Sequence, residues 1–463
     1  MSTLLLRRTP PLLTLRPATK TATPRRIATT RRMSSTGNIS PSSSYPRAHL
    51  IPTSGTYPRG WVAGGVATGV KKTGAKDLTL VASPAHGVTG AAVFTQNAFA
   101  AAPVVVSKAV LSQQHTSTLS ALVVNSGCAN ACTGAQGLED AWRMSRKVDA
   151  EMPPPAKGTL VMSTGVIGQH LSMPKIEKGI EALVNGMGDA HEDWMAAAEG
   201  VMTTDTFPKL RSRAFGGYRM AGWSKGAGMI HPNMATMLSA IFTDAHITRE
   251  CLDAATRYAA DRSFNAISID GDTSTNDTFA VLANAAAETD GSTTPTLISD
   301  LTSREYLAFR THLTEFAAEL AKLIVRDGEG ATKFVEIHVT GATTFQDART
   351  IASTIATSPL VKTALYGKDA NWGRIICAVG YSGVPIVPAA VNLHIAALAN
   401  PANTLHLFKN GAPHDTDEAK AALILDEEDL KLTVQVGRGD EEAKMYTCDF
   451  SHGYISINAD YRS

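Results

Sequence analysis

The chain has 463 residues, of which 44% are hydrophobic and 18% are charged, and its formal net charge is +1. This length predicts two or three domains, and the near-zero charge gives no field that would attract nucleic acid or an anionic membrane. The cysteines form no CxxC pair, which disfavours a disulfide framework and a structural zinc site. No uninterrupted apolar run reaches about 18 residues, so we expect no membrane span.

The first 45 residues are rich in Arg, Ser and Thr, and the first acidic residue of the whole chain is Asp77. Short apolar runs broken by proline do not make the hydrophobic region of a secretory signal. Arg-rich, Ser-rich and acid-poor composition is typical of an organellar transit peptide. We therefore predict a mitochondrial transit peptide at 1–34, cut near Arg32–Ser35, and a protein of the mitochondrial matrix. The alternative is a disordered basic tail.

From about Gly60 onward, short apolar runs alternate with Gly, Asn and Ser, which is typical of short strands. Strands are expected at 78–83, 91–95, 102–111, 120–127 and 159–167. Apolar residues at helical spacing predict helices at 138–152 and 174–200.

The second half of the chain mixes both patterns, and its strongest helical signal lies at 302–326. Strands are expected at 236–245, at 333–342 and on both sides of a polar turn within 265–285. Further helices are expected at 248–264 and 345–356, and a hairpin at 444–463. Because strands and helices do not alternate regularly, we predict α+β layers rather than a doubly wound sheet.

The stretch HPNMATMLSA (231–240) places Thr236 between a turn and an apolar run, and Pro232 blocks a continuous helix or central strand through it. A threonine hydroxyl becomes a good nucleophile when its own α-amine serves as the base. That amine exists only after the chain is cut before Thr236, and such a cut can be autocatalytic. The alternative is an ordinary strand threonine, present for its β propensity.

Several blocks of the chain resemble, in the same order, those of the ornithine acetyltransferase (glutamate N-acetyltransferase) family. They are VVNSGCANACTG (123–134), STGVIG (163–168), MTTDTFPK (202–209), KGAGMIHPNMATMLSAIFTDA (225–245), DGDTSTNDT (270–278), VRDGEGATK (325–333) and GKDANWGRI (367–375). Together they extend over essentially the whole chain after the predicted transit peptide. One departure is Cys128, which stands where the family pattern has Asn.

The resemblance implies a layered α/β sandwich of the ornithine acetyltransferase or DmpA-like type, with a smaller C-terminal α/β domain. It also implies a cut between Ala235 and Thr236. The α chain would then comprise 35–235. The β chain would comprise a core part, 236–340, and a C-terminal domain, 341–463. The family assembles two α and two β chains.

The resemblance further implies that Thr236 takes the acetyl group of N2-acetylornithine and passes it to glutamate through a covalent intermediate. Thr164 and Gly165 would form the oxyanion hole, because a strand that ends in a glycine turn can present a hydroxyl and a backbone N–H together. Without the family, a simple strand-to-turn boundary is the better interpretation of STGVIG.

The family's substrate contacts fall on a lysine, a threonine pair, a carboxylate and the C-terminus of this chain. They are Lys225, Thr203 or Thr204, Glu329, Asn458 and Ser463. A cation suits the α-carboxylate common to both substrates, and a carboxylate suits an ammonium group. The bland alternatives are an exposed loop lysine, a polar turn and a solvated glutamate.

No metal or cofactor is expected, because the spacing of Asp270, Asp272 and Asp277 does not complete a calcium-binding loop and fits a polar turn better. His231 lacks the partners of a catalytic triad and is interpreted as a turn residue. Some family members also use acetyl-CoA, and no nucleotide-binding motif decides that point here. The remaining alternatives are an N-terminal-nucleophile aminopeptidase or amidase and an uncleaved binding protein.

Overall fold

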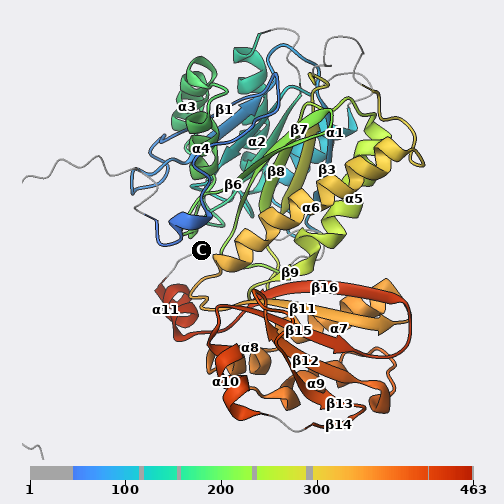
Figure 1. The fold of residues 1–463 in the computed structure, drawn as a ribbon. Helices are drawn as coiled ribbons and strands as arrows, with labels where there is room; N and C mark the ends of the chain where they lie inside the picture. Colours follow the sequence, from blue (N-terminus) through green and yellow to red (C-terminus); the bar gives the residue numbers. More distant parts are fainter. Residues whose placement is uncertain are drawn as a thin grey trace, which may run out of the picture. The chain divides into compact units, whose positions relative to one another are not determined.

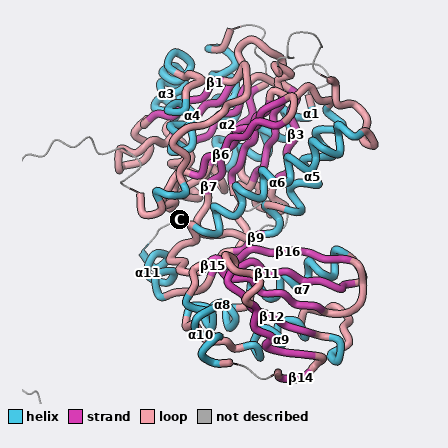
Figure 2. The backbone as a smooth tube through the Cα atoms, viewed as in Figure 1, coloured by secondary structure: helices cyan, strands magenta, loops and turns pink. Residues whose placement is uncertain are grey.

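The computed structural model describes residues 45–113, 119–153, 158–231, 237–287, 296–414 and 417–460. Contacts divide the chain into residues 1–41 and a second unit, 42–463, to which all described residues belong. Within that unit the strands form three sheets, which Figure 2 shows in magenta. The described residues also form the short 3-10 turns η2 (Ala48–Leu50), η3 (Phe264–Ala266) and η4 (Pro388–Ala390).

The first sheet has four strands in the order β1-β2-β4-β5. Its strands are β1 (Val62–Val66), β2 (Leu78–Ala82), β4 (Ala121–Asn125) and β5 (Thr159–Ser163). The helices around it are α1 (Ala102–Ser112), α2 (Gly134–Glu151), α3 (Met173–Gly186) and α4 (His191–Gly200). Every residue of β2, β4 and β5 is buried, as expected for strands that are covered on both faces.

The second sheet has five strands in the order β3-β10-β8-β7-β6. Its strands are β3 (Thr89–Phe94), β6 (Lys209–Phe215), β7 (Tyr218–Lys225), β8 (Leu238–Thr243) and β10 (Thr278–Ala283). The two central strands, β8 and β10, run parallel, with Leu238 beside Thr278. The start of β8, the start of β10 and the end of β7 therefore meet at one edge of the sheet.

Helices α5 (Arg249–Arg262) and α6 (Arg304–Arg326) lie side by side against the second sheet (Figure 1). Successive residues of β8 explain the layering, because their side chains alternate between two cores. Leu238, Ala240 and Phe242 belong to the core that includes the first sheet. Ile241 belongs to the core beneath α5 and α6. The result is an α-β-β-α sandwich.

The third sheet has seven strands in the order β14-β13-β12-β15-β11-β16-β9 and its own hydrophobic core. Its strands are β9 (Ile267–Ser268), β11 (Phe334–Ala342), β12 (Asn392–Ala397), β13 (Thr404–Lys409), β14 (Ala412–Pro413), β15 (Asp429–Gln435) and β16 (Glu441–Cys448). The helices of this region are α7 (Phe345–Thr357), α8 (Pro359–Tyr366), α9 (Trp372–Gly380), α10 (Glu418–Asp426) and α11 (His452–Asp460). The domain boundary predicted at 340/341 stays a prediction.

The strand predicted at 102–111 is wrong, since these residues form helix α1. The valine-rich sequence suggested β structure, but Pro103 stands in the first turn, where a helix tolerates it. Val106 and Val110, four residues apart, are both buried on one face of the helix. Packing of that face outweighs the strand preference of valine.

The hairpin predicted at 444–463 is also wrong in its second half. Strand β16 ends at Cys448, and His452–Asp460 is helix α11. The alternation in YISIN resembled a strand, yet Ile455 is 67% exposed and lies on the outside of that helix. The helix predicted at 174–200 is two helices, α3 and α4, because the chain leaves the helical conformation after Gly186.

The other predicted strands and helices occur within a few residues of their expected bounds. Within the described part of the chain, no helix combines the length and the apolar character that crossing a membrane requires.

Candidate active site

A pocket of about 180 Å³ opens at the edge of the second sheet where β7, β8 and β10 meet. Residues from segments far apart in the sequence line it, and they include most of the predicted site residues: Thr164, Gly165, Thr203, Thr204, Lys225, Glu329 and Asn458. The structure thus brings these seven side chains or backbone groups together. Their roles stay predictions.

The turn that contains Thr164 and Gly165 follows directly after β5. The Thr164 N–H donates to the Asn125 carbonyl at 2.9 Å, which extends the pairing of β4 and β5 by one residue. Gly165 then adopts a φ of +124°, and a Cβ there would stand 2.8 Å from the backbone of Gly127 and Cys128. Only glycine fits this turn, because its backbone conformation and the closeness of the 127–128 segment both exclude a side chain.

Lys225 is the last residue of β7, and its half-buried ammonium group donates to Thr164 Oγ1 at 3.1 Å. Among the described residues no carboxylate lies within ion-pair distance of Lys225 Nζ. Burial lowers the pKa of Lys225, Asp205 opposes this shift, and Lys209 adds to it. The pocket therefore contains a cation whose charge is not neutralised by direct contact.

Glu329 also lines the pocket, and it lies two residues after the C-cap of α6. Its backbone N–H donates to the Ala227 carbonyl at 2.8 Å, and its Oε2 accepts a hydrogen bond from Asn458 Nδ2, also at 2.8 Å. Asn458 can reach Glu329 because α11 is a helix, and Asn458 Nδ2 also donates to the Tyr454 carbonyl at 3.0 Å. Helix α11 thus supplies one wall of the pocket.

Thr203 and Thr204 lie in the connection between α4 and β6. The Thr203 N–H donates to Asp205 Oδ2 at 2.8 Å, so the buried Asp205 carboxylate fixes this loop from behind. Both threonines line the pocket, and the choice between them as the substrate contact remains open.

Sequence analysis missed Asp277, which was interpreted as part of a polar turn. It lies directly before β10, is 2% exposed and lines the pocket. Its Oδ2 has no hydrogen-bond partner in the described part of the chain. Burial raises the pKa of Asp277 well above its ordinary value, against the opposing effects of Ser274 and Lys225. Its place beside β8 depends on strand register, which the DGDTSTNDT block does not reveal.

The other two aspartates of that block do not join Asp277. Asp270 accepts hydrogen bonds from the N–H groups of Met229 and Ile230 at 2.6 and 2.8 Å, whereas Asp272 is exposed. Asp270 thereby holds the backbone that leads into the HPNMATMLSA stretch. In the part of the chain that the structure describes, no group of three or more His, Cys, Asp or Glu residues could hold a metal ion.

Three predicted residues, Ala235, Thr236 and Ser463, lie outside the described residues. The residues that flank positions 232–236 in the pocket wall are Ile230 on one side and Met237 on the other. Asp277 belongs to the same strand edge, since the Thr278 N–H donates to the Met237 carbonyl at 2.9 Å.

Comparison with known proteins decides the family. The ArgJ family model matches residues 62–463. The chain belongs to the ArgJ family. An arginine biosynthesis bifunctional protein ArgJ 1, mitochondrial, from Botryotinia fuckeliana is 51% identical over 91% of this chain and 93% of its own length. The corresponding ArgJ of Sordaria macrospora is 52% identical over 91% and 92%. A crystal structure of ArgJ from Bacillus halodurans is 38% identical and covers 47% of this chain and 96% of its own, with a TM-score of 0.42.

Membership of the ArgJ family confirms the resemblance seen in the sequence and the predicted α+β layered fold. The protein is an acyltransferase of arginine biosynthesis. The mitochondrial localisation predicted from the first residues is likewise confirmed, because the similar fungal proteins are mitochondrial.

Proposed function

We propose that this ArgJ protein transfers the acetyl group of N2-acetylornithine to glutamate at the pocket between β7, β8 and β10, with Thr236 as the nucleophile. One observation supports this most strongly. A cation (Lys225), a carboxylate (Glu329) and the Thr164–Gly165 turn line a single pocket, and so do residues on both sides of the segment that carries Thr236.

The charges in the pocket suit amino-acid substrates. N2-acetylornithine carries an α-carboxylate and a δ-ammonium group, and glutamate carries two carboxylates and an α-ammonium group. Lys225 would bind the α-carboxylate that both share, through a charge-assisted hydrogen bond. Glu329, held by Asn458, would bind an ammonium group. Thr203 or Thr204, and Ser463 at the chain end, would complete the contacts to substrate.

The Thr164–Gly165 turn would stabilise the tetrahedral intermediate. Because Thr164 Oγ1 accepts a hydrogen bond from Lys225, its own proton remains to be donated elsewhere. That hydroxyl and the Gly165 N–H would donate to the oxyanion that forms when Thr236 attacks the acetyl carbonyl. Donors fixed in this way stabilise the transition state without reorganising during the reaction.

The reaction proceeds in two half-reactions with balanced protons. The Thr236 Oγ–carbon bond forms while the α-amine of Thr236 takes the hydroxyl proton. That amine then gives the proton to the α-nitrogen of ornithine as the amide bond breaks. The neutral amine of glutamate then attacks the acetyl-enzyme and gives a proton to the α-amine of Thr236. That amine returns the proton to Thr236 Oγ as the ester bond breaks, so N-acetylglutamate leaves and Thr236 is regenerated. The similar proteins are named bifunctional. The second activity loads the acetyl group from acetyl-CoA and delivers it to the same acceptor.

The α-amine of Thr236 exists only after cleavage at Ala235–Thr236. Self-cleavage would give an α chain, 35–235, and a β chain, 236–463, after removal of the transit peptide at 1–34 in the mitochondrial matrix. We further propose an assembly of two α and two β chains. Denaturing electrophoresis with N-terminal sequencing tests the two cleavage sites, and native mass spectrometry tests the assembly.

A direct assay tests the whole proposal. Purified protein is given N2-acetylornithine and glutamate, and ornithine and N-acetylglutamate are measured; acetyl-CoA replaces acetylornithine in a parallel reaction. Thr236→Ala is expected to remain one uncut chain and to produce neither product. Release of acetate in place of N-acetylglutamate would favour an amidase, and an active, uncut Thr236→Ala protein would refute the proposed nucleophile.

A further inference from the structure

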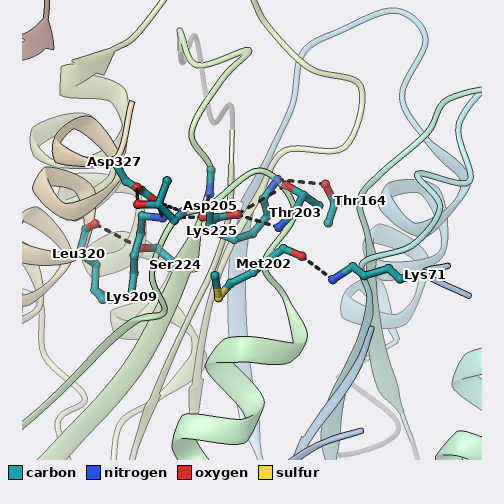
Figure 3. A network of polar contacts seen from close by, with 12 residues as sticks. Lys71, Thr164, Met202, Thr203, Asp205, Lys209, Ser224, Lys225, Leu320 and Asp327 are labelled. Atoms are coloured by element: carbon teal, nitrogen blue, oxygen red, sulfur yellow. Dashed lines mark hydrogen bonds and ion pairs between the residues drawn. The ribbon is translucent and has the colours of Figure 1, made fainter. Parts of the chain in front are cut away.

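Behind the pocket lies a buried ion cluster of Lys209, Asp205 and Asp327 (Figure 3). Lys209 Nζ donates to Asp205 Oδ1 and to Asp327 Oδ2, each at 2.5 Å. The side chains of Lys209 and Asp205 are 0% exposed and that of Asp327 is 1% exposed. Isolated charges at this depth would be very costly, so each of the three depends on the other two.

Each carboxylate of the cluster also holds a segment that lines the pocket. Asp205 Oδ1 accepts the Gly226 N–H at 2.8 Å, directly after Lys225, and Asp205 Oδ2 accepts the Thr203 N–H at 2.8 Å. Asp327 Oδ2 accepts the Thr206 N–H at 2.9 Å, two residues after Thr204, and Asp327 itself is the C-cap residue of α6, two residues before Glu329. Through Lys209, the cluster joins the three segments that present the proposed substrate contacts.

Strand register fixes the place of Lys209 relative to Lys225. Lys209 is the first residue of β6 and pairs with Ser224 of β7, which directly precedes Lys225. In Figure 3, Lys209 and Asp327 lie on one side of Asp205, and Thr164 lies on the other. Asp205 thus stands between two lysines and forms an ion pair with only one of them.

With both carboxylates ionised, the charges of these four residues balance only if both lysines are protonated. Burial raises the pKa of Asp327, and Lys209 opposes that shift. Burial alone would raise the pKa of Asp205, but Lys209 and Lys225 hold it below its ordinary value. Burial would likewise lower the pKa of Lys209, yet Asp205 and Asp327 raise it. If Lys209 were neutral or absent, Lys225 would remain as a cation beside Asp205, and Lys71 would also act on Asp205 electrostatically.

We propose that Lys209 is a positioning residue for the acetyl transfer. Lys209 forms ion pairs with Asp205 and Asp327, and it thereby leaves the Lys225 ammonium group directed at the substrate carboxylate. Lys209 touches no substrate itself. The inference rests on the proposed function, because it takes Lys225 and Glu329 to be substrate contacts. It assigns a role to a fully buried lysine that does not line the pocket.

Lys209→Met removes the charge and keeps much of the side-chain volume. Asp205 then attracts Lys225 away from Thr164, so KM for acetylornithine should rise about tenfold, while kcat changes by less than about threefold. The Lys209 charge also lowers the pKa of Lys225. Its loss should therefore raise that pKa and move the alkaline limb of kcat/KM to higher pH.

A second variant, Lys209→Met/Asp327→Asn, separates the effect of Lys209 on folding from its effect on the position of Lys225. It removes one positive and one negative charge together, so it avoids an extra uncompensated buried carboxylate. We expect it to recover most of the melting temperature lost in the single variant and to keep the shifted alkaline limb. If the single variant does not fold, this double variant decides the question.

Lys362→Met is the matched control, since Lys362 is also 0% exposed, and it donates to Thr447 Oγ1 at 2.9 Å away from the pocket. It should lower the melting temperature without moving the alkaline limb. If the wild type is active and a folded Lys209 variant has the same KM and the same alkaline limb, the role of Lys209 is overturned while the proposed function stands. A wild type that makes no N-acetylglutamate from acetylornithine would instead overturn the proposed function.

Discussion

Gly228→Ala would displace the Glu329 carboxylate while leaving the fold intact. A Cβ at position 228 would stand 2.5 Å from Cδ of Glu329 and would also press on both carboxylate oxygens. The backbone of Gly228 itself adopts no left-handed conformation, so alanine adds no strain there. The carboxylate is the far end of a flexible side chain, and it can move away.

The size of the effect follows from that displacement. Two carbon atoms need about 3.5 Å of separation, so the carboxylate must move back by about 1 Å. Its hydrogen bond from Asn458 Nδ2, now 2.8 Å long, would lengthen or break. Loss of one hydrogen bond to a charged substrate group costs about 1.5–3 kcal/mol, which corresponds to a rise in KM of roughly 10- to 100-fold.

Steady-state kinetics with acetylornithine and glutamate, together with thermal unfolding, measures both parts of this prediction. The melting temperature should stay within about 3 °C of the wild type, because no backbone atom has to move. Gly186→Ala is the control, since a Cβ at Gly186 meets no atom within 4 Å. An unchanged KM in Gly228→Ala would refute the substrate-binding role of Glu329. A large loss of stability would refute the argument that only the side chain yields.

Three further predictions concern Gly165, Asp277 and two cysteines. Gly165→Ala should lower kcat about 10²- to 10³-fold in a folded protein, as judged by circular dichroism, because the oxyanion donors would be displaced from the 127–128 backbone. The melting temperature of Asp277→Asn, compared with that of the wild type, should increase between pH 4 and pH 7. The pKa of Asp277 is raised in the native state, which therefore keeps a proton that the unfolded chain releases. The wild type accordingly loses stability as the pH rises through that range. An equal difference in melting temperature between the variant and the wild type at pH 4 and pH 7 would contradict this. In the native protein, iodoacetamide should modify the exposed Cys132 and spare Cys128, which is buried and whose pKa burial raises. Modification of Cys128 before Cys132, as seen by peptide mass spectrometry, would contradict this.

The elements that sequence predicted best are those whose hydrophobic spacing and packing agree. The long helix α6 has buried residues at helical spacing from Phe309 to Ile324, and β8 alternates between two cores. Helix α1 was missed because valine favours strands while its packing requires a helix. Helix α11 was missed because YISIN alternates like a strand, although Ile455 faces solvent.

The candidate site could be predicted only where the family resemblance assigns a residue its role. It does so for Gly165 in STGVIG and for Lys225, whose local patterns alone fit a plain turn and an exposed loop lysine. Lys209 and Asp277 receive no such assignment. Lys209 gains its place from the pairing of β6 with β7, and Asp277 from the parallel pairing of β8 with β10. Both depend on tertiary register, which no local pattern encodes.

The charges around the pocket also suit a single site that must bind two different substrates, one in each half-reaction. The donor brings a δ-ammonium group and the acceptor brings a second carboxylate, so a pocket with a strong net charge would favour one substrate at the expense of the other. Lys225 and Glu329 carry opposite charges, and burial raises the pKa of Asp277 well above its ordinary value. The ion cluster of Lys209, Asp205 and Asp327 keeps its charges behind the pocket wall, where they orient Lys225 without meeting the substrate. A pocket that is close to neutral but contains one directed cation can bind the shared α-carboxylate and still accept both side chains.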